Sequence, residues 1–443
     1  MSAAGAFRSI HARRALVMGA ELSDVLIDID AEGRIARITP DASAPDDALR
    51  LGTVLAGSGN AHSHAFHRAL RGRTHDQGGD FWVWRREMYR VAAALDPESY
   101  FALAEATFAE MVAAGWTAVA EFHYVHHRPD GTPYDDPNAI GAALIAAARS
   151  AGIRLTLLDT CYLAGGIDKP LEPAQRRFGD GTVDAWLERW HALAELGGDT
   201  VTIGAAMHSV RALAPEDIAR VAALLPAEVP LHIHLSEQQA ENEHALARYG
   251  RTPTQLLAEA GALTPRLSVV HATHLVADDV RRLGDAGVTA VFCPTTEADL
   301  GDGIGPARAL ADAGATLALG SDQNAVIDPF LEVRALEGGE RLRTHARGRF
   351  TPAQLDAARS TGGYRALGLA GGLAVGGLAD LIEVDSESAR TAGSELAQLA
   401  LAATAADVTT VVVGGRVVAR NGHLADDRRP AELLDQSLRR LAR

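Results

Sequence analysis

The central part of the chain repeats one pattern, in which a short apolar run is followed by a segment with helical periodicity. The apolar runs begin at eight positions, Val54, Trp116, Ile153, Val201, Pro230, Leu267, Val288 and Ala315. Near-continuous apolar runs of this length are typical of strands that are buried on both faces. Eight such strands alternating with helices predict an α/β fold, a closed (β/α)8 barrel of the TIM type, with an open doubly wound sheet as the alternative.

The segments between these runs carry helix signals. Helical periodicity covers residues 98–115, 137–152, 215–226 and 252–263. Thr252 is a suitable N-cap for the last of these helices. An Ala-Gly pair precedes five of the predicted strands, with its glycine at Gly115, Gly152, Gly261, Gly287 and Gly314. Because glycine readily adopts the left-handed conformation that ends a helix, these pairs predict C-caps.

The two ends of the chain have a different pattern, that of short antiparallel strands. Residues 25–40 alternate apolar and polar side chains on both sides of Glu32-Gly33, which predicts a hairpin. Residues 379–385 and 409–422 repeat this pattern, the latter around Gly414-Gly415. Both ends together predict a small β-sandwich-like domain. The expected division is 1–52 and 376–443 for this domain and 53–375 for the barrel.

Composition and charge narrow the class of protein. The chain has 443 residues, of which 47% are hydrophobic, with 42 basic and 57 acidic side chains and a net charge of -15. No basic tract is present, so neither nucleic acid nor an anionic membrane is an expected partner. No apolar stretch is long enough to span a membrane. Two cysteines and an N-terminus interrupted by arginines are typical of a cytoplasmic protein without a signal peptide.

Groups that bind metals or protons follow the predicted strands. In a (β/α)8 barrel the chemistry occurs at the C-terminal ends of the strands. The side chains at these ends are His62, His64, Glu121, His123, Tyr124, His208, Arg211, His232, His234, Glu237, His271 and Asp322. In an extended backbone, residues i and i+2 project to the same side, so His62 and His64 can face one point. Imidazole and carboxylate groups together favour borderline metals such as zinc.

Each of these features alone has a structural alternative. Two loop histidines can simply bond to backbone groups, and Asp322 can cap a helix. His232 lies deeper than His234, so we expect it to be a hydrogen-bonded core histidine and His234 to be the ligand. The combination favours a site, because scattered residues would not all fall at the same end of their strands.

These motifs resemble the amidohydrolase superfamily. The resemblance rests on HSH at residues 62–64, HIHLSE at 232–237, HATH at 271–274 and SD at 321–322. Within the superfamily, the segments FWVWR, EFHY and HSVR are similar to those of formimidoylglutamate deiminases, which act in histidine degradation. The similarity covers essentially the whole barrel.

The resemblance implies a set of roles for residues of this chain. One divalent metal ion, expected to be zinc, would be held by His62, His64, His234 and Asp322. His271, Glu237 and Asp322 would transfer protons. The substrate-binding side chains would be Arg85, Tyr124, His208 and Arg211, with His67 nearby. The implied reaction is the hydrolysis of N-formimidoyl-L-glutamate to N-formyl-L-glutamate and ammonia, by hydroxide formed at the metal. The family also implies a homodimer.

The chemistry of this small-molecule substrate agrees with the arginines. It carries two carboxylates, which the global charge of the protein repels, so local guanidinium groups are needed. The chain departs from the resemblance after Asp322, where Gln323-Asn324 replaces an expected Ser-His pair. This departure leaves the exact substrate open. The aromatic side chains of Phe81, Trp82 and Trp84 can form a wall over the site or belong to the core.

Three other hypotheses for the function also agree with the sequence. The chain can be another deaminase of the same superfamily, acting on guanine, cytosine or a related amidine. It can be an inactive barrel that only binds a ligand or another protein. Cys293 can be a nucleophile with His271 as its base, although its apolar surroundings favour a buried structural residue.

Overall fold

Eight parallel strands form the central sheet of the molecule. The protein is described here by a computed structural model, which covers residues 5–75 and 81–442. Within these ranges the strands follow one another in sequence order around the sheet, β5 (Ser58–Ser63), β6 (Trp116–His123), β7 (Arg154–Cys161), β8 (Val201–Met207), β9 (Leu231–Leu235), β10 (Leu267–His271), β11 (Thr289–Phe292) and β12 (Thr316–Leu319). The predicted parallel sheet of a (β/α)8 barrel is thereby confirmed.

The first and last strands of this sheet meet and nearly close the barrel. A parallel bridge joins Ser63 to Asp322. The carbonyl oxygen of His62 accepts hydrogen bonds from the backbone N–H groups of Ser321 and Asp322, at 3.0 and 2.9 Å. The closure therefore brings His62 and Asp322, which are 260 positions apart in the sequence, into direct backbone contact.

The sequence pattern predicted one strand for the apolar run at Val54, but the structure divides this run between two strands. It belongs to β4 (Leu49–Ala56) up to Ala56 and to β5 from Ser58 onward. β4 pairs with β1 (Ser9–Val17) and β13 (Leu381–Val384), whereas β5 pairs with β6. Both halves are buried, so hydrophobicity alone could not reveal that the chain passes here from one sheet to another.

Helices cover the outside of the barrel. They are α1 (Phe81–Ala94), α2 (Pro97–Ala114), α3 (Ala139–Ala151), α4 (Val183–Ala194), α5 (Pro215–Leu224), α6 (Gln239–Tyr249), α7 (Pro253–Glu259), α8 (Ala277–Asp285), α9 (Pro294–Leu300), α10 (Ala307–Ala313), α11 (Pro329–Thr344), α12 (Pro352–Ala357) and α13 (Gly363–Ala366). The predicted caps are present. Gly115 ends α2 at a φ of 100°, and the Thr252 side chain accepts a bond from the backbone of Gln255 at the start of α7.

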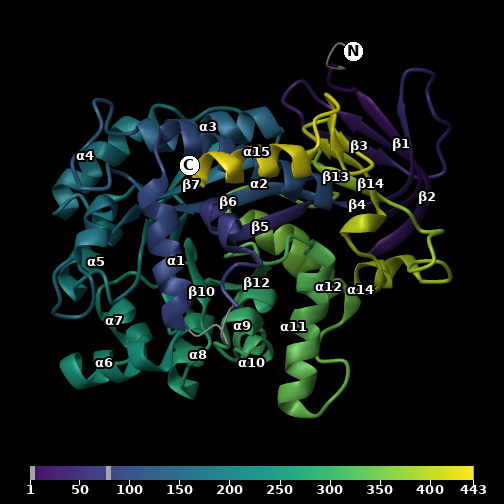
Figure 1. The fold of residues 1–443 in the computed structure, drawn as a ribbon. Helices are drawn as coiled ribbons and strands as arrows, with labels where there is room; N and C mark the ends of the chain where they lie inside the picture. Colours follow the sequence, from purple (N-terminus) through teal and green to yellow (C-terminus); the bar gives the residue numbers. More distant parts are fainter. Residues whose placement is uncertain (1–4, 76–80, 443) are drawn as a thin grey trace.

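A second, mixed sheet is built from both ends of the chain. Its strand order is β16-β15-β14-β13-β4-β1-β2-β3. The strands not yet introduced are β2 (Ala20–Ile29), β3 (Ile35–Thr39), β14 (Val408–Val413), β15 (Arg416–Arg420) and β16 (His423–Leu424). The predicted hairpins at Gly33 and at Gly414-Gly415 are both confirmed. Figure 1 shows the early strands, in purple, beside the late ones, in yellow, at one end of the molecule.

The C-terminal segment ends in a helix that the sequence pattern did not reveal. α15 (Pro430–Leu441) leaves the mixed sheet and packs against α2 on the barrel (Figure 1). Leu434 and Leu438, which are four residues apart on one helical face, pack against the large core.

We propose that the domains are those expected from the sequence, with residues 1–52 and 376–443 in the small β domain and residues 53–375 in the barrel. Strand β4 crosses the first of these boundaries. No helix in the described ranges is long and apolar enough to cross a membrane.

A buried ion pair joins the barrel to the mixed sheet. The Asp380 carboxylate accepts hydrogen bonds from Arg154 Nε at 2.7 Å, from the Tyr364 hydroxyl at 2.7 Å and from the backbone of Gly414 at 2.7 Å. The side chain of Arg154 is 7% exposed and that of Asp380 is 1% exposed. Removing one partner would leave the other charge buried without compensation.

We therefore expect Asp380→Ala to lower the free energy of unfolding by about 3–5 kcal/mol. The measurement is urea-induced unfolding followed by circular dichroism. The matched control is Asp28→Ala, because Asp28 forms an exposed pair with Arg37 on the outer part of the same sheet. The control should change the free energy by no more than about 1 kcal/mol. Equal effects of the two substitutions would contradict the proposed role of Asp380.

Candidate active site

A cavity of about 860 Å³ opens at the C-terminal ends of the barrel strands. Its wall includes ten of the side chains that the sequence pointed to, namely His64, His67, Arg85, Tyr124, His208, Arg211, His234, Glu237, His271 and Asp322. His62 touches the cavity residues His234 and Asp322. The structure thus brings together residues that lie on six different strands or strand ends and on α1.

Three imidazoles and one carboxylate converge at the base of this cavity. His62 Nε2 lies 3.2 Å from His234 Nε2 and 3.4 Å from Asp322 Oδ1. His64 Nε2 lies 3.6 Å from the same carboxylate oxygen. All four side chains are buried. Separations of this size between ligand atoms are those of groups that surround one cation.

Hydrogen bonds at the far side of two rings fix their orientation. The Nδ1 atoms of His64 and His234 donate to the carbonyl oxygens of Phe122 and His208, at 2.9 and 3.0 Å. Each ring then presents an unprotonated Nε2 to the cluster, which is the arrangement found in metal-binding histidines. Burial, together with the neighbouring His62, lowers the pKa of His64 to about 3, so this ring is neutral. The residues therefore fit a divalent metal ion.

His271 differs from the other histidines of the site because carboxylates surround it. Its Nε2 lies 3.8 Å from Asp322 Oδ2, and its Nδ1 lies 3.5 Å from Glu297 Oε1. Burial lowers the pKa of His271, but the charges of Glu237, Glu297 and Asp322 outweigh burial and raise this pKa to about 10. His271 and Asp322 also have positive φ angles, of 71° and 42°. Such strained backbone conformations are concentrated at functional sites.

The two arginines expected to bind the substrate, Arg85 and Arg211, are each held by acidic side chains. Arg211 Nε lies 2.9 Å from Glu241 Oε2, and Arg211 Nη2 lies 3.4 Å from Glu237 Oε2. Arg85 Nη2 donates to the Tyr89 hydroxyl and to Glu172 Oε2, both at 3.2 Å. Glu241 is buried, whereas the side chain of Glu172 is 54% exposed and can move aside. A carboxylate ligand would thus exchange with Glu172 at Arg85.

Neutral polar groups complete the wall. His67 Nε2 and the Tyr124 hydroxyl form a hydrogen bond of 3.1 Å, and the ring of His208 lies 4.3 Å from that of Tyr162. Burial raises the pKa of Tyr124 well above its usual value, so its hydroxyl keeps the proton and can donate. His232 lies outside this wall, since its Nε2 donates to the carbonyl of Ala366 at 2.7 Å. It is a core histidine, as the spacing argument anticipated.

The residues that depart from the expected Ser-His pair have structural partners of their own. Gln323 Oε1 accepts a hydrogen bond from Trp84 Nε1 at 2.9 Å. Asn324 has a φ of 58°, a conformation that asparagine tolerates well, and its side chain bonds to the carbonyl of His64 at 3.1 Å. Trp84 lines the cavity and packs against the large core, so both sequence expectations for it hold. The side chains of Phe81 and Trp82 lie outside the described part of the structure.

Sequence reasoning missed the acidic partners of the site. Glu241, Glu297 and Glu172 hold Arg211, His271 and Arg85, yet they lie on helices or loops whose patterns look like ordinary solvated faces. Their only signal was that Glu241 lies in the segment that follows the HIHLSE motif. Cys293 was correctly expected to be structural. It is fully buried, and burial raises the pKa of its thiol well above its usual value.

In a second histidine cluster beside the site, an arginine already engages the carboxylate. His126 Nδ1 lies 3.7 Å from Asp159 Oδ2, with His123 nearby. Arg189 already donates two hydrogen bonds to Asp159, at 2.7 and 2.9 Å, and Trp186 donates a third at 2.8 Å. A guanidinium group in this position neutralises the carboxylate, so the cluster is a buried ion-pair network.

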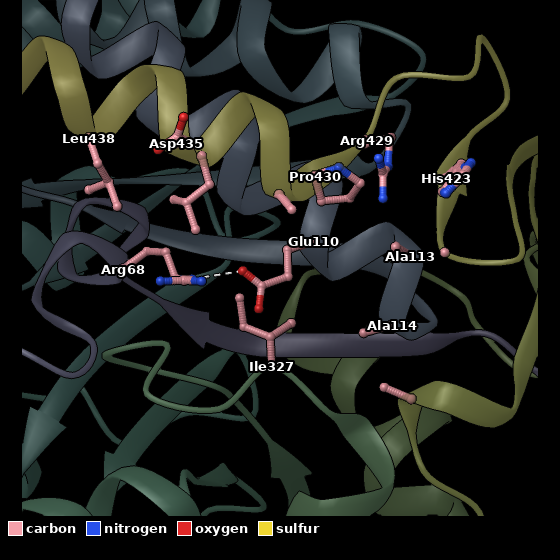
Figure 2. A pocket seen from close by; sticks show the side chains of 14 residues that line it. Arg68, Glu110, Ala113, Ala114, Ile327, His423, Arg429, Pro430, Asp435 and Leu438 are labelled. Atoms are coloured by element: carbon pink, nitrogen blue, oxygen red, sulfur yellow. Dashed lines mark hydrogen bonds and ion pairs between the residues drawn. The ribbon is translucent and has the colours of Figure 1, made fainter.

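A second cavity, of about 610 Å³, lies on the outside of the barrel between α2 and α15. On its wall Arg68 Nε donates to Glu110 Oε2 at 2.7 Å, and Figure 2 marks this ion pair with a dashed line. Its remaining wall is mostly apolar, with Ile327, Leu434 and Leu438 among its members. None of the side chains expected to act in catalysis lines it, so the chemistry belongs to the larger cavity.

A family model, a sequence relative and solved structures all relate the chain to amidohydrolases and deaminases. The amidohydrolase family matches residues 53–418. A formimidoylglutamate deiminase of Pseudomonas aeruginosa is 41% identical over 97% of this chain and 98% of its own length. The crystal structure of an amidohydrolase from Brucella melitensis superposes with a TM-score of 0.89 at 33% identity, over 98% of this chain and all of that one. An adenosine deaminase from Xanthomonas campestris with bound zinc has a TM-score of 0.83 at 25% identity, over 98% and 97%.

Proposed function

The chain belongs to the amidohydrolase family, and from this premise we propose that it hydrolyses N-formimidoyl-L-glutamate to N-formyl-L-glutamate and ammonia. It is a hydrolase that acts on a C–N bond of a linear amidine, as does its relative of 41% identity. The observation that carries the proposal is the meeting, in one cavity, of a metal-type cluster with two arginines. The cluster suits hydrolysis, and the arginines suit a substrate with two carboxylates.

Members of this family depend on a metal, and the described residues include a buried set of ligands for it at the base of the cavity. We propose that His62, His64, His234 and Asp322 hold a single zinc ion. When bound, such an ion lowers the pKa of a water molecule to roughly 7 and so supplies hydroxide at neutral pH. The four side chains provide the neutral nitrogens and the carboxylate oxygen that zinc prefers.

The proton transfers are assigned to side chains around this cluster. Asp322 takes the proton of the attacking water with the assistance of His271, whose Nε2 faces Asp322 Oδ2. The positive charge of a bound metal would lower the pKa of His271 and so free this nitrogen for the transfer. The water oxygen adds to the formimino carbon, and Glu237 delivers a proton to the nitrogen that leaves. The hydroxyl of the adduct then gives its remaining proton to the same nitrogen by way of Asp322. The C–N bond to this nitrogen breaks, ammonia departs, and the formyl group remains on glutamate. The proton that Asp322 and His271 took from the water returns to Glu237 and restores the starting state. General acid–base steps of this kind typically contribute about 10²–10⁴-fold in rate.

The remaining side chains of the cavity orient the substrate. Arg85 and Arg211 bind the two carboxylates, because a guanidinium group matches a carboxylate with two parallel hydrogen bonds. Tyr124 and His208 contribute neutral hydrogen-bonding groups, and His67 fixes the Tyr124 hydroxyl. We further propose that the enzyme is a cytoplasmic homodimer that takes a small-molecule substrate and has no nucleic-acid or membrane partner, in keeping with its net charge of -15.

A substrate panel on zinc-loaded enzyme tests the function. We expect ammonia release from N-formimidoyl-L-glutamate with a kcat/KM about 10- to 10²-fold above that for an analogue lacking one carboxylate. This margin reflects the loss of one charge-assisted contact of about 1.5–3 kcal/mol. Guanine, cytosine and adenosine are the matched comparison substrates. Release of ammonia from one of these bases, and none from the amidine, would replace the proposal with a nucleobase or nucleoside deaminase.

A further inference from the structure

A chain of hydrogen bonds ties helix α1 to the rim of the barrel. Trp84 Nε1 on α1 donates to Gln323 Oε1 at 2.9 Å, and Gln323 Nε2 donates to Asp299 Oδ2 on α9 at 2.6 Å. His75, which precedes α1 in the sequence, bonds to the other oxygen of Asp299 at 3.0 Å. Both ends of the Gln323 amide are therefore used, and they connect three segments that are far apart in the sequence.

Gln323 lies in a rigid part of the structure. It directly follows Asp322, whose backbone is bonded to His62 across the closure of the barrel. Its own side chain is almost completely buried, at 4% exposure for the residue. The hydrogen bond to this amide therefore fixes the Trp84 indole of α1 relative to the rim of the barrel. A buried amide whose oxygen and nitrogen both have a hydrogen-bond partner also resists displacement, because an unpaired polar group in the interior is costly.

The helix that Gln323 holds carries substrate-binding groups. α1 contributes Trp84, Arg85, Met88 and Tyr89 to the wall of the cavity. Trp84 and Arg85 are neighbours in one rigid helix, so fixing the indole also fixes the start of the Arg85 side chain. Arg85 also donates to the Tyr89 hydroxyl on the same helix and to Glu172, which is half exposed and has to be displaced by a ligand. The bond between Gln323 and Trp84 therefore contributes to the position of Arg85 relative to the cluster at Asp322.

We propose that Gln323, with Asp299 behind it, is a positioning residue that holds α1 and sets the distance between Arg85 and the reacting centre. The inference rests on the proposed function in so far as Arg85 binds a substrate carboxylate. It gives a role to the side chain that replaces the serine expected after Asp322. A displaced guanidinium group makes poorer hydrogen bonds to its ligand, so an error of position at Arg85 weakens substrate binding.

The test breaks the same hydrogen bond from each side. Trp84→Phe removes the indole N–H and keeps an aromatic ring in the cavity wall, and Gln323→Leu removes the amide. We expect each variant to raise KM for N-formimidoyl-L-glutamate about 10-fold, to lower kcat by less than about 3-fold, and to keep the metal content of the wild type. The double variant should be no worse than the poorer single variant, because both changes remove one interaction. Arg86→Ala, at an exposed position of the same helix, is the matched control and should change neither constant.

Hydrogen exchange of the unliganded protein provides a readout that does not need activity. Backbone amides of residues 84–94 should exchange faster in Trp84→Phe and in Gln323→Leu than in the wild type, and should be unchanged in Arg86→Ala. An unaltered KM, additive effects in the double variant, or unaltered exchange in α1 would each overturn the inference. If wild-type enzyme released no ammonia from the amidine, the proposed function would fail, and the exchange experiment would still decide whether Gln323 holds α1.

Discussion

Asp322→Asn is expected to abolish ammonia release and to remove the bound metal. The carboxylate of Asp322 lies 3.4 Å from His62 Nε2 and 3.8 Å from His271 Nε2, so one side chain serves both the ligand cluster and the proton transfer. Loss of both roles should lower kcat by at least about 10⁴-fold. Asparagine has the shape of aspartate and tolerates a φ of 42°, so the fold should be retained.

The measurement pairs ammonia release with metal content per chain and with a circular dichroism spectrum. Wild-type protein purified without chelators should contain about one metal ion per chain, and the variant close to none. Asp285→Ala, at an exposed position of α8, is the control and should match the wild type in all three. A variant that kept its metal and its activity would refute the ligand assignment. A wild-type protein without metal or turnover would instead support an inactive, ligand-binding barrel.

His271→Asn should lower kcat by about 10²–10⁴-fold while leaving the metal in place. His271 faces Asp322 but is also engaged by Glu297 at 3.5 Å, an environment that favours proton transfer over metal ligation. Asparagine accepts the left-handed backbone at this position, where φ is 71°. The retained metal is what distinguishes His271 from His62, His64 and His234.

Steady-state kinetics and metal analysis of this variant check the assignment. His274→Ala is the comparison, because His274 follows the same strand and has no role in the proposed reaction. It should keep a kcat within about 3-fold of the wild type, well below the effect of an acid–base group. Near-normal kcat in His271→Asn would show that another group takes the proton, whereas loss of its metal would make His271 a ligand.

The local patterns of the sequence were sufficient for most of the architecture. A strand that is buried on both faces needs a continuous apolar run, and a helix often ends at a glycine in the left-handed conformation. Each of these two signals is contained in a few consecutive residues, so the sequence shows it directly. The rule that parallel strands of a barrel bring their C-terminal ends to one face likewise predicted that the polar side chains at these ends lie together, and they line one cavity. These features depend on local spacing and on one general rule of topology.

The same patterns failed where two arrangements have equal hydrophobicity. The run at Val54 is apolar throughout, but only the pairing of β4 with β1 and of β5 with β6 divides it between two sheets. The amphipathic helix α15 packs against α2, which lies more than 300 positions earlier in the sequence. Sequence spacing could not show these partners.

The sequence by itself thus determined most of the elements, their order and the residue types available for chemistry at the strand ends. Tertiary structure alone decided which of these side chains share a partner. Arg211 is held by Glu241, and Gln323 reaches Trp84 across 239 positions. The physical reason is that hydrophobic periodicity specifies which face of an element is buried, whereas a hydrogen bond or ion pair requires two atoms to lie within about 3 Å, and only the packed elements set that distance.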